Sequence, residues 1–254
     1  MVGPLALQPL GQTGLSVSPI GLGTVKLGRI HGVKYPTPAR IPDDDEARQL
    51  LDTARRLGIN LLDTAPAYGT SEERLGGLLA GTREHWVLCT KVGETFDGTH
   101  SHFDFTPESC RQSVQTSLKR LRTDFLDIVL IHSDGHDLDI LRLGTLQALQ
   151  ALQTEGKVRA VGLSHKTVAG AEAAVEQGAD VIMATLNRDH TDELTVIRES
   201  AERGCGVLIK KALQSGHGRA EDLRWVAGQT GVHSIVVGTT DPGHLEENVR
   251  ILLS

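Results

Sequence analysis

The sequence predicts an α/β protein: a (β/α)8 barrel, also called a TIM barrel, with a β-hairpin at its N-terminal end. Three observations support this fold. Eight short apolar runs are spaced along the chain, segments with helical periodicity lie between them, and the connections on the two sides of these runs differ in length. Alternating strands and helices are typical of a parallel sheet, and eight repeats close a barrel. We expect residues 1–254 to form one domain.

The eight apolar runs are the predicted strands. Each is short and rich in Val, Ile and Leu, as expected for strands that are buried on both faces of a parallel sheet. A Gly-Gln-Thr-Gly turn precedes them, so roughly the first 18 residues are expected to form the hairpin. The predicted strands are 19–24, 59–64, 86–91, 125–132, 158–164, 180–185, 206–210 and 233–239.

Two of the segments between these runs illustrate the predicted helices. From Ala47 onward, apolar residues recur at i, i+3, i+4, i+7 and i+10, after the acidic residues 43–45 and before Gly58. A later segment opens with Thr106 as a candidate N-cap and Pro107 at the first helical position. Acidic or hydroxyl residues at the start and glycine after the end are the usual signals for helix boundaries.

The connections between these elements are asymmetric. Helix-to-strand joins are short, whereas the strand-to-helix loops at 25–44 and 92–106 are long. In barrels of this type the catalytic residues come from the strand-to-helix side. Aromatic residues in these two loops predict a partly apolar wall for a substrate; they are Tyr35, Phe96, Phe103 and Phe105. Glycines end the short joins at Gly58, Gly156, Gly178 and Gly204.

Composition narrows the classes of partner and location. With 26 basic and 32 acidic residues the formal charge is −6, so the chain offers no strong positive field for nucleic acid or anionic lipid. The three cysteines are widely spaced and form no CxxC pair, which favours a reducing cytoplasm. No stretch approaches the ~18 apolar residues that span a bilayer. We therefore expect a cytoplasmic protein with a small-molecule substrate, either a monomer or a weak homo-oligomer.

Four chemically capable side chains fall at or just beyond the ends of neighbouring predicted strands. Asp63, Lys91 and His132 follow the second, third and fourth strands, and Tyr68 lies on the loop after Asp63. Taken singly, each has an ordinary structural explanation: a helix cap, a solvated strand end, a core histidine or a packing aromatic. Strand ends of consecutive barrel strands converge on one mouth, however, so we expect the four to share a site.

Together the four side chains suit acid catalysis at a carbonyl group. A lysine ammonium beside a tyrosine favours the phenolate and should lower the tyrosine pKa from ~10, while an aspartate keeps the lysine charged. The tyrosine then becomes a usable proton donor. A histidine can hydrogen-bond the same carbonyl oxygen, and general acid catalysis of this kind contributes ~10²–10⁴-fold.

The order of these residues resembles the aldo-keto reductase family, with D-T-A-x-x-Y-G around Asp63 and Tyr68, T-K at Lys91 and I-H at His132. The resemblance covers nearly the whole chain through LGQTGLSVSPIGLGT, SLKRLRTDFLDIVLIH, GKVRAVGLS and GVHSIVVGTTDPGHLEENV. It implies a barrel that binds an extended nicotinamide dinucleotide and reduces aldehydes or ketones by direct hydride transfer. It also implies that Tyr68 is the general acid, Asp63 and Lys91 activate it, and His132 orients the carbonyl.

The same resemblance implies which residues contact the cofactor, with NADPH as the family default and NADH possible. A Rossmann G-x-G-x-x-G fingerprint and a Walker A pattern are both absent from the sequence, which agrees with this kind of binding. The implied contacts are Gly23, Thr24, Asp63, Ser164, His165, Lys210, Leu213, Ser215, Gly238, Thr239, His244, Glu247 and Asn248.

Several of these positions depart from the usual family residues. His165 stands where Asn is usual, Met183 stands near a common Gln, and Lys210 replaces an aromatic that often stacks on the nicotinamide. Gly238 and His244 occupy positions that are often Lys and Arg. Because neutral imidazole and a glycine offer little charge to a 2′-phosphate, we expect weak cofactor binding with modest preference for NADPH.

Two other functions remain open at this point. Histidines at 100–102, 132–137 and His165 supply enough ligands for a metal-dependent barrel hydrolase, although that function leaves Tyr68 and Lys91 without a role. The altered nicotinamide contacts would also suit a non-catalytic subunit that binds and senses the cofactor. We predict no metal site, and turnover of a carbonyl substrate would separate an enzyme from a sensor.

Overall fold

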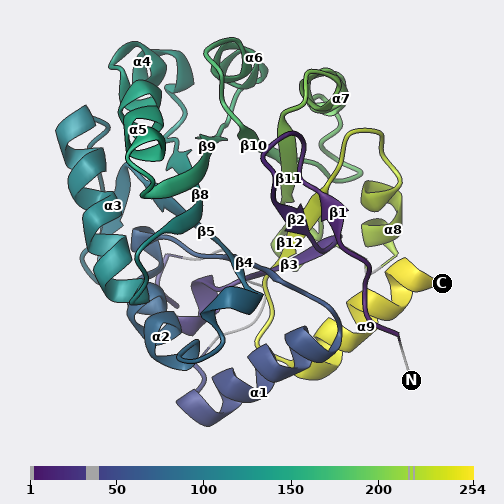
Figure 1. Cartoon of the computed structure of the whole chain (residues 1–254). Coiled ribbons are helices and arrows are strands. Elements are labelled where there is room, and N and C mark those ends of the chain that lie inside the picture. Colours follow the sequence, from purple (N-terminus) through teal and green to yellow (C-terminus); the bar gives the residue numbers. More distant parts are fainter. Residues whose placement is uncertain (1–2, 33–39, 217, 220) are drawn as a thin grey trace.

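All eight predicted strands form one closed parallel barrel in the computed structural model, which confirms the (β/α)8 fold (Figure 1). The structure describes residues 3–32, 40–216, 218–219 and 221–254. Around the barrel, starting from the first strand, the order is β3 (Ile20–Gly23), β4 (Leu61–Asp63), β5 (Val87–Val92), β8 (Leu126–His132), β9 (Val158–Ser164), β10 (Val181–Thr185), β11 (Gly206–Lys210) and β12 (Ser234–Val237), which pairs with β3 again.

Helices surround the barrel (Figure 1). The predicted start of α1 is confirmed, because the Asp43 side chain accepts from the Glu46 N–H while the Glu46 side chain accepts from the Asp43 N–H. Thr106 likewise caps α3. The helices are α1 (Asp44–Arg56), α2 (Ser71–Leu78), α3 (Pro107–Leu121), α4 (Asp137–Arg142), α5 (Thr145–Thr154), α6 (Val168–Glu176), α7 (Leu194–Glu202), α8 (Asp222–Ala227) and α9 (Pro242–Leu253), with short 3-10 turns η1 (Val25–Leu27), η2 (Pro66–Tyr68), η3 (Arg83–His85) and η4 (Gln214–Gly216).

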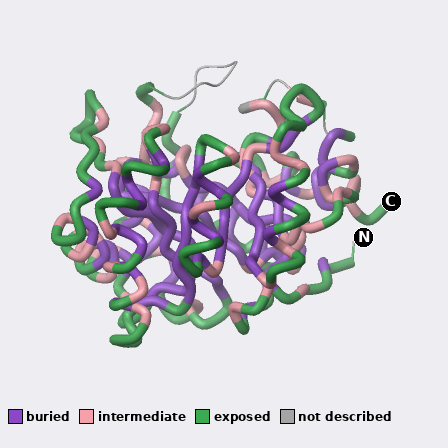
Figure 2. Tube along the Cα trace, turned by 90° about the horizontal axis from the view of Figure 1, so that it is seen from above, coloured by how far each residue is buried: buried purple, intermediate pink, exposed green. Residues whose placement is uncertain are grey.

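The predicted N-terminal hairpin is also present, as β1 (Gln8–Pro9) paired with β2 (Ser16–Val17). Its apolar residues Leu10, Leu15 and Val17 join the cluster inside the barrel, and the Gln12 N–H donates to the Gly204 carbonyl at 2.7 Å. The hairpin therefore covers the end of the barrel where the strands begin. Figure 2 shows the buried residues in the centre of the molecule, surrounded by exposed segments.

The opposite end of the barrel carries the long loops. One of them, predicted only as a loop, folds into a second hairpin, β6 (Glu94–Phe96) with β7 (Ser101–Phe103). Its turn contains Asp97 and Gly98, with Gly98 at a φ of 103°. An Asp-Gly pair between strand-like residues is a strong hairpin signal, so this element could have been found from the sequence.

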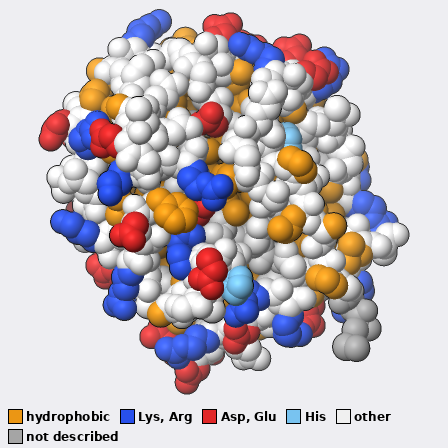
Figure 3. Space-filling model, viewed as in Figure 1, with side chains coloured by type: hydrophobic (Ala, Val, Ile, Leu, Met, Phe, Trp, Pro, Cys, Tyr) orange, Lys and Arg blue, Asp and Glu red, His pale blue; other side chains and the backbone are white. Residues whose placement is uncertain are grey.

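The surface carries charges of both signs, and the thiols are unpaired. On the face in Figure 3, basic and acidic side chains are interspersed. Cys89, Cys110 and Cys205 are free and buried. Within the described residues, no helix is long and apolar enough to cross a membrane.

Candidate active site

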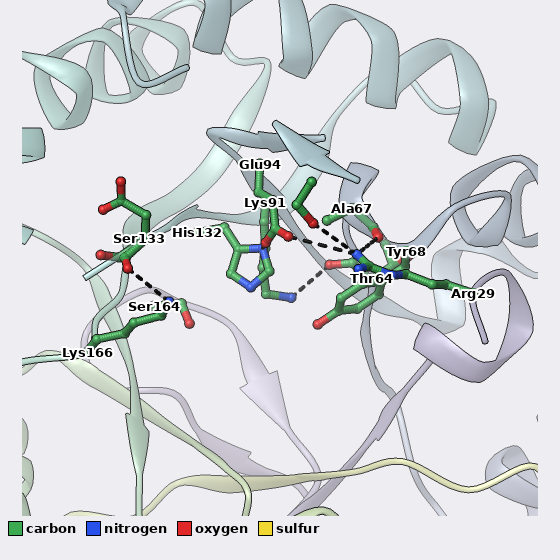
Figure 4. Close-up of polar contacts among 12 residues, drawn as sticks. Arg29, Thr64, Ala67, Tyr68, Lys91, Glu94, His132, Ser133, Ser164 and Lys166 are labelled. Atoms are coloured by element: carbon green, nitrogen blue, oxygen red, sulfur yellow. Dashed lines mark hydrogen bonds and ion pairs between the residues drawn. The ribbon is translucent and has the colours of Figure 1, made fainter. Parts of the chain in front are cut away.

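The register of the barrel brings the predicted catalytic side chains to one mouth. Asp63 ends β4, Lys91 lies near the end of β5, and His132 ends β8 directly beside Ser164, which ends β9. Figure 4 shows Lys91, Tyr68 and His132 projecting toward the same space. The four residues thus form one cluster, called here the tetrad: Asp63, Tyr68, Lys91 and His132.

Tyr68 reaches the tetrad because its loop is packed tightly against the loop after β3. A Cβ on Gly28 would lie 2.3 Å from the Tyr68 carbonyl oxygen, and a Cβ on Gly69 would lie 2.2 Å from the Gly28 carbonyl oxygen. Gly69 also adopts a φ of 61°. Only glycine fits this close approach without strain, which explains why the tyrosine lies in an Ala/Pro/Gly loop.

Lys91 and Asp63 form a buried ion pair at the centre of the tetrad. Lys91 Nζ lies 2.6 Å from Asp63 Oδ1 and donates to the Thr64 carbonyl at 2.8 Å. The two side chains are only 1% and 4% exposed. Burial on its own would lower the pKa of Lys91, but the Asp63 charge opposes it and the net pKa is raised. Lys91 is therefore a permanent cation at the mouth of the barrel.

Tyr68 lies beside this pair, with its hydroxyl 3.5 Å from Asp63 Oδ2 and its ring centroid 4.9 Å from Lys91 Nζ. Burial raises the pKa of Tyr68, Lys91 lowers it, and Asp63 raises it; the net direction is upward. The predicted lowering is therefore wrong, because burial outweighs the lysine charge. Tyr68 keeps its proton at neutral pH and has it available to donate.

His132 faces Tyr68 edge-on, with ring centroids 6.3 Å apart and planes at 86°. Its Nδ1 lies 2.8 Å from Glu94 Oε2, an ion-pair distance without the geometry of a linear hydrogen bond. Burial lowers the pKa of His132, and Lys91 adds to this effect while Glu94 opposes it. Burial would raise the pKa of Glu94, but His132 and Arg29 lower it to about 2. His132 is accordingly neutral at pH 7, beside a charged carboxylate.

Glu94 and Arg29 are the site residues that the sequence analysis missed. Arg29 donates to the Ala67 carbonyl at 2.9 Å and lies 3.8 Å from Glu94 Oε1 (Figure 4). Its guanidinium also lies 3.7 Å from the centroid of the Phe96 ring. It connects the loop that carries Tyr68 to the hairpin that carries Glu94. These contacts join residues far apart in the sequence, and only the Asp-Gly turn in the hairpin hinted at them.

The tetrad lines a cavity of about 560 Å³ at this end of the barrel. Most of the predicted cofactor contacts line the same cavity, together with Lys26, Met183 and Lys211. Those predicted contacts, besides Asp63, are Gly23, Ser164, Lys210, Leu213, Gly238, Thr239, His244, Glu247 and Asn248. The tetrad lies at what we call the inner end of the cavity, and His244, Glu247 and Asn248 of α9 at its outer end.

Two predicted cofactor contacts, Thr24 and His165, are not among the lining residues. The Thr24 hydroxyl donates to the Asp63 carbonyl at 2.9 Å and so supports the strand that carries the aspartate. The buried His165 ring turns toward Glu193, with Nε2 2.6 Å from its Oε2. Ser215 lies in η4, and the structure does not describe its side chain.

Lys210 occupies the inner end from the β11 side. Its Nζ donates to the Ser164 hydroxyl at 2.9 Å and to the His165 carbonyl at 2.6 Å. Burial lowers the pKa of Lys210 to about 7, with a further lowering from Lys211. Unlike Lys91, this lysine titrates near neutral pH.

The outer end is polar and open to solvent. His244 Nδ1 lies 3.8 Å from Asp241 Oδ2, and the two side chains are 69% and 57% exposed. Asp241 also caps α9, where its side chain accepts from the Gly243 N–H at 2.8 Å. A carboxylate therefore lies next to the histidine that would face the adenosine end of a dinucleotide.

The loop aromatics do not form the expected apolar wall, as far as the described residues show. Phe96 packs under Arg29, Phe103 stacks on Phe105 with centroids 6.1 Å apart, and Phe105 is buried against Gly93. None of these three lines the cavity. They hold the β6–β7 hairpin in place instead. Tyr35 lies outside the described residues.

The histidines that could have supported a metal site are dispersed. His102 Nε2 lies 2.7 Å from Asp97 on the exposed hairpin, His136 Nδ1 lies 3.2 Å from Asp134, and His165 contacts Glu193. Among the described residues, no three or more His, Cys, Asp or Glu side chains are grouped to hold a metal ion. The metal-dependent hydrolase therefore has no ligand set in this part of the chain.

Comparison with known proteins identifies the family of this chain. A family model described as the aldo/keto reductase family matches residues 19–207. A solved protein of Pseudomonas aeruginosa, assigned to the aldo-keto reductases, superposes with a TM-score of 0.89 at 50% identity, covering 97% of this chain and 93% of that chain.

Two curated relatives carry names of specific enzymes. L-galactose dehydrogenase of Arabidopsis thaliana is 39% identical over 63% of this chain and 48% of its own length, so the match spans about half of that relative. NADH-specific methylglyoxal reductase of Escherichia coli strain K12 is 32% identical over 82% of this chain and 67% of its own length.

Proposed function

Since the chain belongs to the aldo/keto reductase family, we propose that it is an NAD(P)H-dependent oxidoreductase that reduces aldehyde or ketone carbonyls to alcohols, with Tyr68 as the general acid. The observation that carries this proposal is the buried Lys91–Asp63 ion pair beside a protonated Tyr68, at the inner end of the cavity. His132 faces the same space. A buried ion pair next to a phenol is well suited to proton transfer. By itself, a buried ion pair contributes little to the stability of a fold.

The cavity suits an extended anionic dinucleotide. It continues from the tetrad to the exposed rim at α9, and Lys26 and Lys211 add positive charge along it. Gly216, Gly218 and Gly238 leave room for close approach of a pyrophosphate to the backbone. When bound, the reduced nicotinamide supplies the hydride. We assign its binding to Gly23, Ser164, Lys210, Leu213, Ser215, Gly238, Thr239, His244, Glu247 and Asn248.

The tetrad side chains divide the proton transfer among them. Tyr68 donates its proton to the carbonyl oxygen, and the Lys91 ammonium stabilises the phenolate that remains. Asp63 keeps Lys91 charged and in place. His132 directs the carbonyl oxygen toward the phenol, and Glu94 holds the ring at Nδ1.

Cofactor preference is expected to be modest. The outer end offers a histidine beside Asp241, and this carboxylate opposes a 2′-phosphate. One relative is named as NADH-specific. We therefore propose that both NADPH and NADH are used, with a small preference for NADPH.

Titration of the purified protein with NADPH and with NADH, followed by assays with nitrobenzaldehyde and small dicarbonyl compounds, tests the proposal. We expect binding of both cofactors and oxidation of the reduced cofactor that depends on the added carbonyl. A folded protein that binds neither cofactor at millimolar concentration contradicts the proposed function.

A cofactor-sensing subunit is the second candidate, and one observation favours it. Met183, only 2% exposed, and Lys210 line the inner end. In the family, a Gln and an aromatic residue usually contact the nicotinamide there. This candidate predicts cofactor binding without turnover of any carbonyl in the panel. The same assay therefore decides between the two.

A further inference from the structure

Lys210 is a partly buried cation without a carboxylate partner among the described residues. Its two hydrogen-bond acceptors, the Ser164 hydroxyl and the His165 carbonyl, are both neutral. Among the described residues, no carboxylate lies within ion-pair distance of its Nζ. A lone ammonium in a cavity is costly to keep charged, so its protonation responds to any charge that enters that cavity.

The charged groups that face Lys210 come from several elements. Lys211 follows it, Lys91 approaches from β5, and the neutral His132 ring lies on β8. Of the two carboxylates that act on it, Glu193 is held by His165, and Asp137 is held by the Thr167 hydroxyl and N–H groups. These carboxylates are committed to other partners, which agrees with a pKa for Lys210 of about 7.

Lys210 lies at the end of the cavity where the nicotinamide ring has to be. His132 and Ser164 are paired in the barrel register, and Lys210 Nζ bonds Ser164. A hydride donor to a carbonyl that sits between Tyr68 and His132 must place its ring in this inner end. This step rests on the proposed function.

We propose that Lys210 makes the protein discriminate between the redox forms of its cofactor by charge: its ammonium form disfavours the positively charged oxidised nicotinamide and accepts the neutral reduced ring. The oxidised and reduced forms carry the same phosphates, so the ratio of their dissociation constants isolates the charge of the ring. Lys210 thereby favours binding of reduced cofactor and release of oxidised cofactor after the reaction.

The proposal predicts how the affinity for oxidised cofactor changes with pH. Below about pH 7 Lys210 is an ammonium in the free protein. Binding of the oxidised cofactor must then either remove the proton from Lys210 or bring two positive charges close together. Affinity for the oxidised form therefore weakens as pH falls, by up to ~tenfold per pH unit. Affinity for the reduced form changes little, because its ring is neutral and its carboxamide oxygen can accept from the ammonium.

Calorimetric titration with the oxidised and the reduced form of one cofactor, from about pH 6 to about pH 8, tests this inference. We expect the ratio of the oxidised to the reduced dissociation constant to increase as pH falls, and oxidised cofactor to release protons on binding near pH 6.5. Lys210→Met should give a low ratio that no longer depends on pH in this range. Lys210→Arg should give a high ratio that is equally independent of pH. Lys157→Met, which removes an exposed lysine just before β9, at the end of the barrel opposite the cavity, is the matched control and should keep the wild-type slope.

The outcomes separate this inference from the proposed function. Binding of both forms with a ratio that does not change with pH, or with a slope that survives in Lys210→Met, overturns the role of Lys210 alone. Equal loss of affinity for both forms in Lys210→Met also overturns it, because that result means Lys210 contacts the phosphates. Absence of binding by either form overturns the proposed function, and this inference with it.

Discussion

The two ends of the cavity each place a basic side chain next to a carboxylate, but in different surroundings. At the inner end, Lys91 and Asp63 are 2.6 Å apart and almost completely buried; at the outer end, His244 and Asp241 are 3.8 Å apart and mostly exposed. Charges interact strongly in a low-dielectric interior, whereas water and salt weaken them at a surface. We therefore expect substitutions at the inner end to have large effects on activity and stability, and substitutions at the outer end to have small effects.

The largest expected effect is at the inner end, from Tyr68→Phe. The ring stays but the transferable proton is lost, so turnover should fall by ~10²–10⁴-fold. The dissociation constant of the cofactor should change little, because the ring still fills its place. Steady-state kinetics and cofactor titration measure the two quantities. Turnover close to that of the wild type would mean that the acid lies elsewhere.

Lys91→Met tests how strongly burial increases the stability lost when one partner of an ion pair is removed. It leaves Asp63 buried without its partner, which we expect to destabilise the fold by ~3–5 kcal/mol. Arg111→Met is the matched control, since it breaks a partly exposed pair with Glu155 at 2.8 Å and should cost only ~0–1 kcal/mol. Urea denaturation measures both. Equal losses in the two variants would contradict the importance of burial.

Glu94→Gln should have a smaller effect, on the pKa of His132 at the inner end. It removes the charge that opposes burial at His132, so the pKa of His132 should decrease further. NMR titration of the imidazole measures this. Glu84→Gln, next to the exposed His85, is the control and should leave His132 unchanged.

The lowered pKa of Glu94 predicts that the stability difference between the wild type and Glu94→Gln depends on pH. The folded pKa of Glu94, about 2, is below its unfolded value of ~4.3. Its carboxylate therefore stabilises the fold above about pH 4.3, and this contribution is lost as pH falls toward 2. The difference in unfolding free energy between wild type and Glu94→Gln should shrink over that interval. A constant difference would contradict the lowered pKa of Glu94.

The smallest effect is expected at the outer end, from His244→Arg. A permanent cation there should increase the preference for NADPH over NADH, but only about two- to fivefold, because an exposed pair contributes ~0.2–1 kcal/mol. Asp241→Asn keeps a side-chain acceptor for the helix cap and should act in the same direction. Side-by-side titrations with the two cofactors measure the change. A hundredfold increase would show that the outer end closes over the phosphate.

Local signals account for most of what could be predicted. The eight strands followed from apolar runs, and α1 followed from Asp43, Glu46 and the apolar periodicity, because these patterns act over a few residues. The order of the tetrad along the chain identified the family. The Glu94 contact could not be predicted in the same way, since it depends on where a hairpin folds back relative to β8.

The sequence alone determined the barrel, the family and the identity of the four tetrad residues, because apolar periodicity, turn residues and motif order are written along the chain. Only the tertiary structure decided the protonation of these residues. Tyr68 was expected to lose its proton more easily and instead holds it, because its pKa depends on burial and on Asp63 as well as on Lys91. The lowered pKa of Lys210 has the same kind of origin: the residue is partly buried among groups from distant parts of the chain, and the balance of their charges exists only in the folded protein.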